Sequence, residues 1–252
     1  MVPSMSKQRN IGSKYEKVKE RLLAVKLLSL LKKRFSYREL SRLTGLSESI
    51  LCRYITGKRI PDTEQAKRIL SSIISKLNLM DIILEKIRGM KGYIDLQTIS
   101  VDSLILQLAT IHAYMRYRDK GVTKIIVPET RGIPLATLIA LELNSDLVIA
   151  RRTRENPFEE YIHGVVVESP FNMISFYVPR RSLDQRDRVL IVDDLIQTGK
   201  TIQALSTIVR KSRAKLIGVL VLLALGDSWK QINVNEIDVL VKITDPSKLM
   251  PV

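Results

Sequence analysis

Short apolar runs alternate with longer amphipathic stretches through the carboxyl-terminal part of the chain, from Thr123 onward. The short runs are rich in Val and Ile and predict strands. They lie at residues 125–127, 147–149, 165–167, 174–178, 189–192, 216–223 and 239–243. Apolar positions recur at helical spacing in residues 102–118, 135–143 and 202–210. The alternation predicts an α/β fold with a mainly parallel sheet covered by helices, plus a hairpin around Pro170-Phe171-Asn172.

The first third of the chain has helical periodicity only. Residues 1–13 are polar and contain Pro3 and Gly12, which predicts a loose tail. Residues 14–34 predict a helix with one apolar stripe. The stripe comprises Val18, Leu22, Val25, Leu27, Leu28 and Leu31. A helix on a membrane surface would show the same basic, amphipathic pattern, but the helices that follow favour a core helix.

Two short helices are predicted on either side of the tight turn Thr44-Gly45-Leu46. Ser36 begins the first, and Ser47 caps the second, which runs through about Tyr54. Glycine gives the backbone freedom that a sharp reversal between helices requires. The expected small core comprises Leu40, Leu43, Leu46, Ile50, Leu51 and Ile55. This pattern, with the turn at residues 57–61, resembles the helix-turn-helix of Cro and the phage repressors; a purely structural helix pair is the alternative.

Residues 63–88 predict one further long helix with many apolar positions. So much apolar surface exceeds what a lone helix on a small domain can bury, so part of it is expected to contact a partner chain. A homodimer follows as a hypothesis. Gly89 and Gly92 then indicate a boundary between a domain of residues 1–92 and a domain of residues 93–252.

The charge is distributed unevenly along the chain. Residues 1–92 contain 21 Lys and Arg against 8 Asp and Glu, a net +13, and the remaining 20 and 18 leave +2 for residues 93–252. A basic domain beside a nearly neutral one is typical of nucleic-acid binding by the basic part. If the second helix of the pair binds in the major groove, the residues expected to contact base edges or phosphates are Ser47, Glu48, Ser49 and Arg53. In the turn that follows, Lys58 and Arg59 are expected to contact phosphates.

Composition excludes several other classes. Only one cysteine, Cys52, is present, which excludes an internal disulfide framework and is typical of a reducing cytosol. The two histidines, His112 and His163, lie far apart, so no metal site built from protein ligands alone is expected. The most apolar run, residues 216–225, is about half as long as a bilayer requires. We therefore expect a cytoplasmic protein without a membrane span.

The strongest chemical motif lies at residues 189–201, Val-Leu-Ile-Val-Asp-Asp-Leu-Ile-Gln-Thr-Gly-Lys-Thr. An apolar strand ends in two carboxylates and passes through a Thr/Gly turn into a helix. Free backbone N–H groups at a helix start favour a phosphate. Asp193 and Asp194 would repel that phosphate unless they accept hydrogen bonds from ligand hydroxyls. A ribose 5-phosphate satisfies both requirements.

This run resembles the signature of type I phosphoribosyltransferases. The resemblance implies that Asp193 and Asp194 hold the ribose of phosphoribosyl pyrophosphate. It assigns the 5-phosphate to Ile196, Gln197, Thr198, Gly199, Lys200 and Thr201. A Walker A loop is a rival, but Asp194 stands where that loop needs a glycine. A buried strand with a polar loop and no ligand is the other alternative.

Two more loops follow predicted strands and are expected at the same edge of the sheet, where parallel sheets bind ligands. In the first, a glycine opens a helix beneath an arginine, and the resemblance assigns the pyrophosphate to Glu129, Thr130, Arg131 and Gly132. In the second, the three arginines Arg151, Arg152 and Arg154 suit a polyphosphate, although a solvated charge run is the alternative. Mg²⁺ is expected only as a companion of the donor.

Within the family, the chain is most similar to the purine-operon repressor type and to archaeal phosphoribosyltransferase-like regulators, which share the Arg180-Arg181-Ser182-Leu183 lead-in. Gln197 bears on activity. The hypoxanthine-guanine enzymes, which this loop resembles, have an aspartate at the position of Gln197, and that aspartate is assigned to proton transfer. Glutamine cannot take a proton near neutral pH. Adenine and orotate enzymes have alanine instead.

The leading hypothesis is therefore a DNA-binding transcription regulator that senses phosphoribosyl pyrophosphate or a related nucleotide, with no catalytic residue assigned. The alternative is an active phosphoribosyltransferase with an accessory DNA-binding domain. A DNA operator, the phosphoribosyl effector and a second copy of the chain are the expected partners.

Overall fold

The computed structural model describes residues 5–77, 79–88, 96–169, 172–234 and 236–244. The chain divides into two compact units, Met1–Asn78 and Leu79–Val252. This division precedes the predicted boundary at residue 92, because α5 (Leu79–Arg88) packs against elements of the second unit. Gly89 and Gly92 themselves lie outside the described residues.

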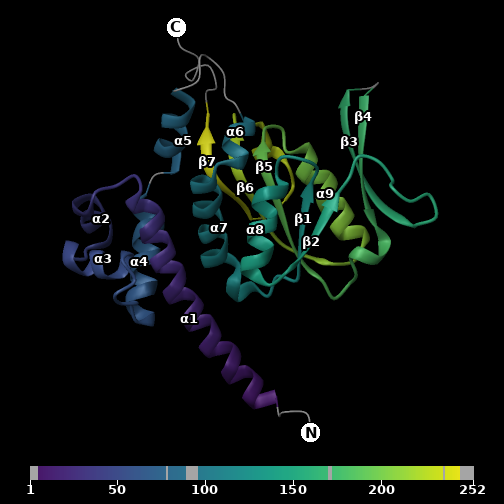
Figure 1. Cartoon of the computed structure of the whole chain (residues 1–252). Coiled ribbons are helices and arrows are strands. Elements are labelled where there is room, and N and C mark those ends of the chain that lie inside the picture. The colour runs from purple at the N-terminus through teal and green to yellow at the C-terminus, as the bar shows by residue number, and fades with distance from the viewer. Residues whose placement is uncertain (1–4, 78, 89–95, 170–171, 235, 245–252) are drawn as a thin grey trace. The chain divides into compact units, whose positions relative to one another are not determined.

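The first unit consists of four helices, coloured purple to blue in Figure 1. They are α1 (Met5–Lys32), α2 (Tyr37–Thr44), α3 (Glu48–Ile55) and α4 (Thr63–Lys76). The prediction of a loose tail was wrong, since α1 already begins at Met5; Gly12 within it lowers helix propensity but does not break a helix. The helix predicted from residue 14 is the rest of α1.

The buried face of α1 differs from the predicted stripe. Leu27, Leu28 and Leu31 are buried as predicted, but Val18 and Leu22 are about half exposed. Leu23 and Ala24 are buried instead. The reason is geometric: α1 packs against α4 and α3, and their position selects which side of a broad apolar surface is covered.

The two short helices lie where the sequence predicts them. Ser36 caps α2 with a full capping box to Glu39, and Gly45 ends it in the left-handed conformation at φ 74°. Ser47 occupies the N-cap position of α3, but its side chain makes no capping hydrogen bond. Leu40 and Leu51 are buried as predicted, whereas Ile50 is exposed and Tyr54 takes a core position. The assignment of this pair as a helix-turn-helix domain stays a prediction.

The long helix predicted for residues 63–88 is two helices. Leu77 has an extended backbone, ψ 114°, which ends α4. The apolar side chains Ile69, Leu70 and Ile73 of α4 are buried within the first unit, and Ile82 and Ile83 of α5 are also buried. Part of the apolar surface that suggested a partner chain is thus buried within the chain, and the homodimer stays a prediction.

The second unit contains a five-stranded parallel sheet in the order β2-β1-β5-β6-β7. Its strands are β1 (Lys124–Pro128), β2 (Asp146–Ala150), β5 (Arg188–Ile196), β6 (Lys215–Leu225) and β7 (Ile237–Ile243). The predicted α/β class with a mainly parallel sheet is confirmed. The largest difference concerns β5, which was predicted to end at Val192 but continues through both aspartates.

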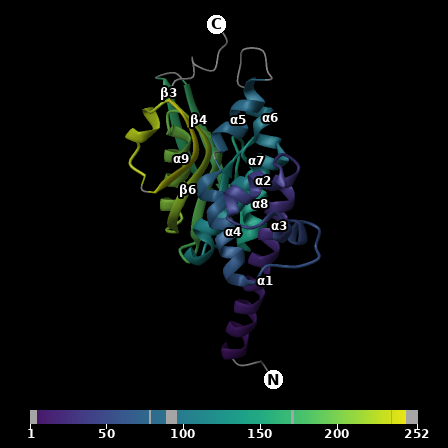
Figure 2. The ribbon, with the colours of Figure 1, turned by 90° about the vertical axis from the view of Figure 1, so that its left-hand side faces the viewer.

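Helices cover both faces of the sheet. Those on one face are α7 (Ser103–Tyr117) and α8 (Ile133–Leu143), while α9 (Lys200–Lys211) covers the other, as Figure 2 shows from the side. All three were predicted. The short helix α6 (Leu96–Val101), which packs against α7 and α8, was not. The 3₁₀ turns η1 (Arg118–Lys120), η2 (Arg180–Ser182) and η3 (Ser228–Gln231) complete the described helical elements.

The predicted hairpin forms a separate two-stranded antiparallel sheet, β3 (Tyr161–Ser169) with β4 (Asn172–Pro179). Most of its predicted turn, Pro170 and Phe171, lies outside the described residues. The hairpin packs on α9 so closely that a Cβ added to Gly164 would lie 2.1 Å from the Ala204 carbonyl oxygen. Glycine is therefore required at this contact.

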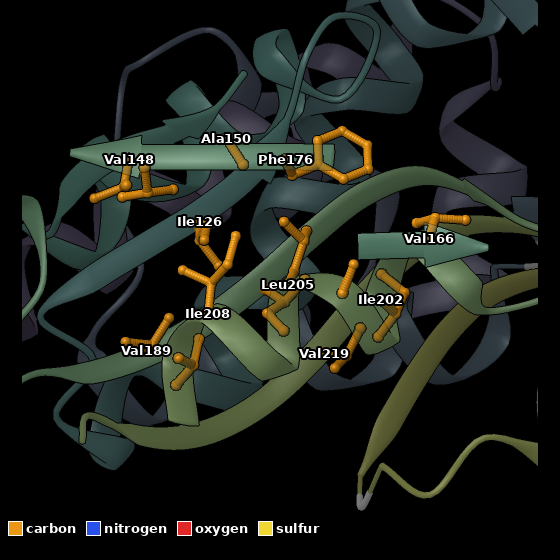
Figure 3. Close-up of a cluster of buried hydrophobic side chains, with 14 of the residues drawn as sticks. Ile126, Val148, Ala150, Val166, Phe176, Val189, Ile202, Leu205, Ile208 and Val219 are labelled. Carbon is orange, nitrogen blue, oxygen red and sulfur yellow. The ribbon is translucent and has the colours of Figure 1, made fainter. Parts of the chain in front are cut away.

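One buried apolar cluster of the second unit lies between the sheet, α9 and the hairpin. In Figure 3, Ile202, Leu205 and Ile208 of α9 lie among side chains of the sheet and of the hairpin. Phe176 of β4 belongs to this cluster. The position of the loop that directly precedes α9, which was predicted to bind phosphate, is consequently set by buried apolar packing rather than by local propensity.

Candidate functional site

A cavity of about 560 Å³ opens at the carboxyl-terminal edge of the sheet. It is lined by Pro128, Glu129, Thr130, Arg131, Arg152, Phe176, Asp193, Asp194, Leu195, Ile196, Gln197, Thr198, Gly199, Thr201 and Ile202. The cavity therefore brings together segments that follow β1, β2 and β5, far apart in sequence. Parallel sheets bind ligands at this edge.

Asp193 is held inside β5 and is only 6% exposed. Its Oδ1 accepts a hydrogen bond from the backbone N–H of Asp194 at 2.9 Å. Burial raises the pKa of the Asp193 carboxyl well above its ordinary value, and the neighbouring carboxylate of Asp194 adds to that rise. An acid kept in this setting gains from any ligand that donates hydrogen bonds to its charged form.

Asp194 has a different set of partners. Its Oδ2 accepts hydrogen bonds from Arg131 Nε at 3.0 Å and from Ser100 Oγ at 3.1 Å. Ser100 lies in α6 and is buried. Sequence analysis did not identify Ser100, because nothing in its surroundings in the sequence indicates that α6 approaches the end of β5.

The raised pKa of Asp193 predicts that the stability of the ligand-free protein falls as the pH rises above about 4. The sign follows because the unfolded chain loses this proton near the ordinary pKa, whereas the folded chain keeps it to higher pH. Asp193→Asn removes the effect, so its stability advantage over the natural chain should grow with pH across that window. Urea unfolding of both proteins along a pH series measures it; a difference independent of pH would contradict the assignment.

The segment after β5 forms the predicted phosphate loop. Gly199 has φ 78° and directly precedes α9. A Cβ there would lie 2.7 Å from a side-chain carbon of Ile232, so both the backbone conformation and the close contact require glycine. Gln197 and Thr198 are exposed in the cavity. Lys200 begins the helix and, of the predicted loop residues, is the one that does not line the cavity.

The loop after β1 forms the opposite wall. The peptide bond between Glu129 and Thr130 is cis. Gly132 does not line the cavity but lies beneath it, where a Cβ would be 2.9 Å from Val127 and 3.3 Å from Asp193 Oδ1. The loop can approach β5 this closely because residue 132 has no side chain, and that approach places Arg131 on Asp194.

Arg151 and Arg152, the first two residues after β2, have separate positions. Arg152 lines the cavity, and its backbone N–H donates to Glu129 Oε1 at 2.8 Å. Arg151 does not line the cavity; its guanidinium lies 3.0 Å from Glu155 and 3.9 Å from Glu129. Of the three arginines predicted to suit a polyphosphate, Arg151, Arg152 and Arg154, only Arg152 lines the cavity.

Sequence analysis also missed the apolar part of the cavity wall. Pro128, Leu195 and Ile202 belong to predicted elements or their ends, and Phe176 comes from the hairpin. The alternating pattern of β4 indicates that Phe176 is on an inward face, but only the packing of the hairpin on α9 places it beside the phosphate loop.

The residues predicted to contact DNA lie in the first unit, on or near α3. Ser47, Glu48, Ser49 and Arg53 are exposed, as are Lys58 and Arg59 in the turn that follows. The hydroxyls of Ser47 and Ser49 are 3.1 Å apart. Nothing in this geometry tests a contact with DNA, so these residue roles stay a prediction.

Within the described ranges, no group of three or more His, Cys, Asp or Glu side chains could hold a metal ion. No helix in the same ranges is long and apolar enough to span a membrane.

The fold and the cavity define an α/β protein that can hold an anionic, hydroxyl-bearing ligand at the edge of a parallel sheet. Residues 101–248 match the family model of the phosphoribosyl transferase domain, and the chain belongs to this family. The type I phosphoribosyltransferase resemblance of residues 189–201 is thereby confirmed at the level of the domain.

Curated relatives of the chain are metabolic enzymes. Adenine phosphoribosyltransferase of Bacteroides thetaiotaomicron is 31% identical over 162 residues, covering 62% of this chain and 89% of that protein. Xanthine phosphoribosyltransferase of Pseudomonas aeruginosa is 28% identical over 150 residues, covering 56% of this chain and 79% of that protein.

Solved structures of the same class share the fold. Adenine phosphoribosyltransferase of Rhodothermus marinus has a TM-score of 0.56 at 20% identity, covering 65% of this chain and 99% of that one. The Trypanosoma brucei enzyme, whose structure contains AMP, pyrophosphate and ribose-5-phosphate, has a TM-score of 0.53 at 20% identity, covering 67% of this chain and 81% of that one.

These comparisons overturn the leading functional hypothesis. The basic first unit and Gln197 favoured a DNA-binding transcription regulator over an enzyme, but the relatives are named adenine and xanthine phosphoribosyltransferases. The hypothesis depended on the basic first unit and on Gln197. A net charge indicates attraction to anions in general, and the absence of one proton-transferring side chain does not remove a donor site. The enzymatic alternative is therefore the better supported one.

Proposed function

We propose that the protein is an active phosphoribosyltransferase that joins a purine base to the ribose 5-phosphate of phosphoribosyl pyrophosphate and releases pyrophosphate. The observation that supports it most directly is the single cavity that contains the paired aspartates, the Gly199 loop and Arg131. Purine is proposed as the base class because relatives from two genera are named for adenine and xanthine.

In this proposal the cavity holds the donor at three points. Asp193 and Asp194 accept hydrogen bonds from the two ribose hydroxyls. The backbone N–H groups of residues 197–201, at the start of α9, surround the 5-phosphate. Arg131 is half exposed and contacts Asp194 in the ligand-free structure. When the ribose hydroxyls bind the Asp194 carboxylate, Arg131 can donate to the pyrophosphate instead.

The reaction needs little covalent chemistry from the protein. A ring nitrogen of the base bonds to the anomeric carbon, the bond from that carbon to the pyrophosphate oxygen breaks, and the base proton passes to solvent. Positive charge develops on the ribose as that bond breaks. The buried carboxylates beside the ribose stabilise this charge, and the loops hold donor and base in line.

Mg²⁺ fits this site as a companion of the donor. A hard cation of this size commonly uses one or two carboxylates together with phosphate oxygens. Asp193, Asp194 and Glu129 line the cavity and could supply the carboxylates. The ion would neutralise the leaving pyrophosphate.

Turnover can be tested with the purified 252-residue chain, phosphoribosyl pyrophosphate and Mg²⁺. Adenine, hypoxanthine, guanine and xanthine are supplied one at a time, and pyrophosphate and nucleotide are measured together. We expect equal amounts of both products with at least one purine. Pyrophosphate without nucleotide would indicate hydrolysis, and no product with any of the four bases would contradict the proposal.

Gln197 provides a prediction about mechanism. Its amide cannot exchange a proton near neutral pH, so Gln197→Ala should lower kcat by less than about tenfold, far less than the 10²–10⁴-fold typical of a lost acid or base. Gln197→Glu is the matched variant that restores an ionisable group. A loss above about a hundredfold in the alanine variant would show that the amide itself is essential.

A further inference from the structure

A second, larger cavity of about 860 Å³ lies at the opposite end of the same sheet. Its wall includes Arg188 at the start of β5, Lys215 at the start of β6, and one face of α9. The paired aspartates lie near the other end of β5, so the two cavities are separated by the length of the strand. The family match and the predicted site residues concern the first cavity only.

The second cavity has an excess of positive charge. Four cationic side chains line it, namely Lys120, Arg188, Arg210 and Lys215, against Asp119 and Glu236. Two of the cations are engaged: Lys120 pairs with Glu236 at 2.8 Å, and the guanidinium of Arg188 donates to the carbonyl oxygens of residues 120 and 121.

The other two cations are available. Among the described residues, the side chains of Arg210 and Lys215 have neither an ion-pair nor a hydrogen-bond partner. One comes from the last turn of α9 and the other from the first residue of β6, and both line one cavity. This arrangement attracts an anion that is large enough to reach both.

The remaining wall suits a planar group. Leu216, Ile217 and Val234 are half-buried and form an apolar surface. The amides of Gln203 and Asn233 also line the cavity, and within the described part of the chain neither has a side-chain hydrogen bond. Amides that offer a donor and an acceptor together match the edge of a nucleobase.

We propose that this second cavity binds a nucleoside phosphate, with the phosphate on Arg210 and Lys215 and the base against Leu216, Ile217 and Val234. Binding at this cavity does not require the proposed transferase activity. A regulatory consequence does rest on it: α9 carries the phosphate loop at its start and Arg210 near its end. A ligand that shifts α9 would change the affinity for the donor, and the reverse, by the same factor.

Equilibrium dialysis with AMP and GMP can count the sites. We expect two nucleotides per chain for the natural protein and one for Arg210→Gln/Lys215→Gln, whose second-cavity affinity should fall at least about tenfold. Asp193→Asn/Asp194→Asn changes only the first cavity, so it should still bind one nucleotide in the second cavity. This expectation holds whether or not the chain has transferase activity. The matched control is Lys67→Gln/Arg213→Gln, which removes the same charge from exposed positions outside both cavities.

Several outcomes would overturn the proposal. If Arg210→Gln/Lys215→Gln and the natural chain bound the same number of nucleotides with the same affinity, the second cavity would be excluded as a nucleotide site. Inorganic phosphate that binds as tightly as AMP would reduce it to a simple anion site. Calorimetric titration of the donor with and without GMP tests the regulatory part, because GMP in the second cavity should change the donor affinity. That part of the change should persist in the control and disappear in Arg210→Gln/Lys215→Gln; an equal change in both variants would remove the regulatory part of the proposal.

Discussion

Replacing Asp193 and Asp194 together by asparagine is expected to weaken the binding of phosphoribosyl pyrophosphate by about a hundredfold or more. A hydrogen bond to a charged group contributes about 1.5–3 kcal/mol, and two such bonds from the ribose would be weakened at once. Both carboxyls are less than a tenth exposed, so water cannot readily replace the lost interactions. Activity should fall at least as far, because charge developing on the ribose would lose its neighbouring carboxylates.

Calorimetric titration with the donor and Mg²⁺ measures this effect directly. Asp146→Asn/Asp184→Asn is the matched control, because it removes the same charge from two acids that are exposed and do not line the cavity. The control should bind the donor as the natural chain does. An affinity of the Asp193/Asp194 variant within about threefold of the control would place the ribose elsewhere.

Gly164→Ala is expected to lower the free energy of unfolding by about 1–3 kcal/mol or more. The added methyl carbon would lie 2.1 Å from the carbonyl oxygen of Ala204 and 2.8 Å from its carbonyl carbon. Both are backbone atoms of α9, so relief requires the hairpin to move away from the helix. For a unit of this size the thermal midpoint should fall by several degrees.

Thermal unfolding of Gly164→Ala beside Val165→Ala separates this contact from general effects in the strand. Val165 is the next residue and is 43% exposed, so its truncation should change the midpoint little. Because Phe176 links the hairpin to the cavity wall, donor affinity should also fall in Gly164→Ala. Equal midpoints for the two variants would show that the hairpin does not depend on this approach.

Much of the second unit could be predicted because its elements are locally encoded. The apolar run of β5 and the glycine before α9 define a strand, a loop and a helix without help from distant residues. The end of β5 could not be predicted in the same way. Asp193 and Asp194 read as the polar end of a strand, yet pairing with β6 continues beyond them.

In the first unit, the positions of the helices could be predicted, but their packing could not. Its helix starts and turns follow from local signals, such as the capping box of Ser36 and the left-handed Gly45. Which side of α1 is buried, and where the long apolar stretch of residues 63–88 breaks, depend on neighbours that no local pattern identifies. The break at Leu77 divides this stretch into two helices, and part of the apolar surface that suggested a partner chain is buried within the chain.

The sequence by itself determined the α/β class, the order of strands and helices, and the motif that carries the family resemblance, because each depends on residue types at short spacing. Tertiary structure decided which candidates share one cavity. In the folded chain, Arg131 and Ser100 contact Asp194, and Phe176 of the hairpin lines the cavity. Arg151 pairs with Glu155 and does not line the cavity. These contacts join segments distant in sequence, and their positions are set by the packing of α9, the hairpin and the sheet into one core.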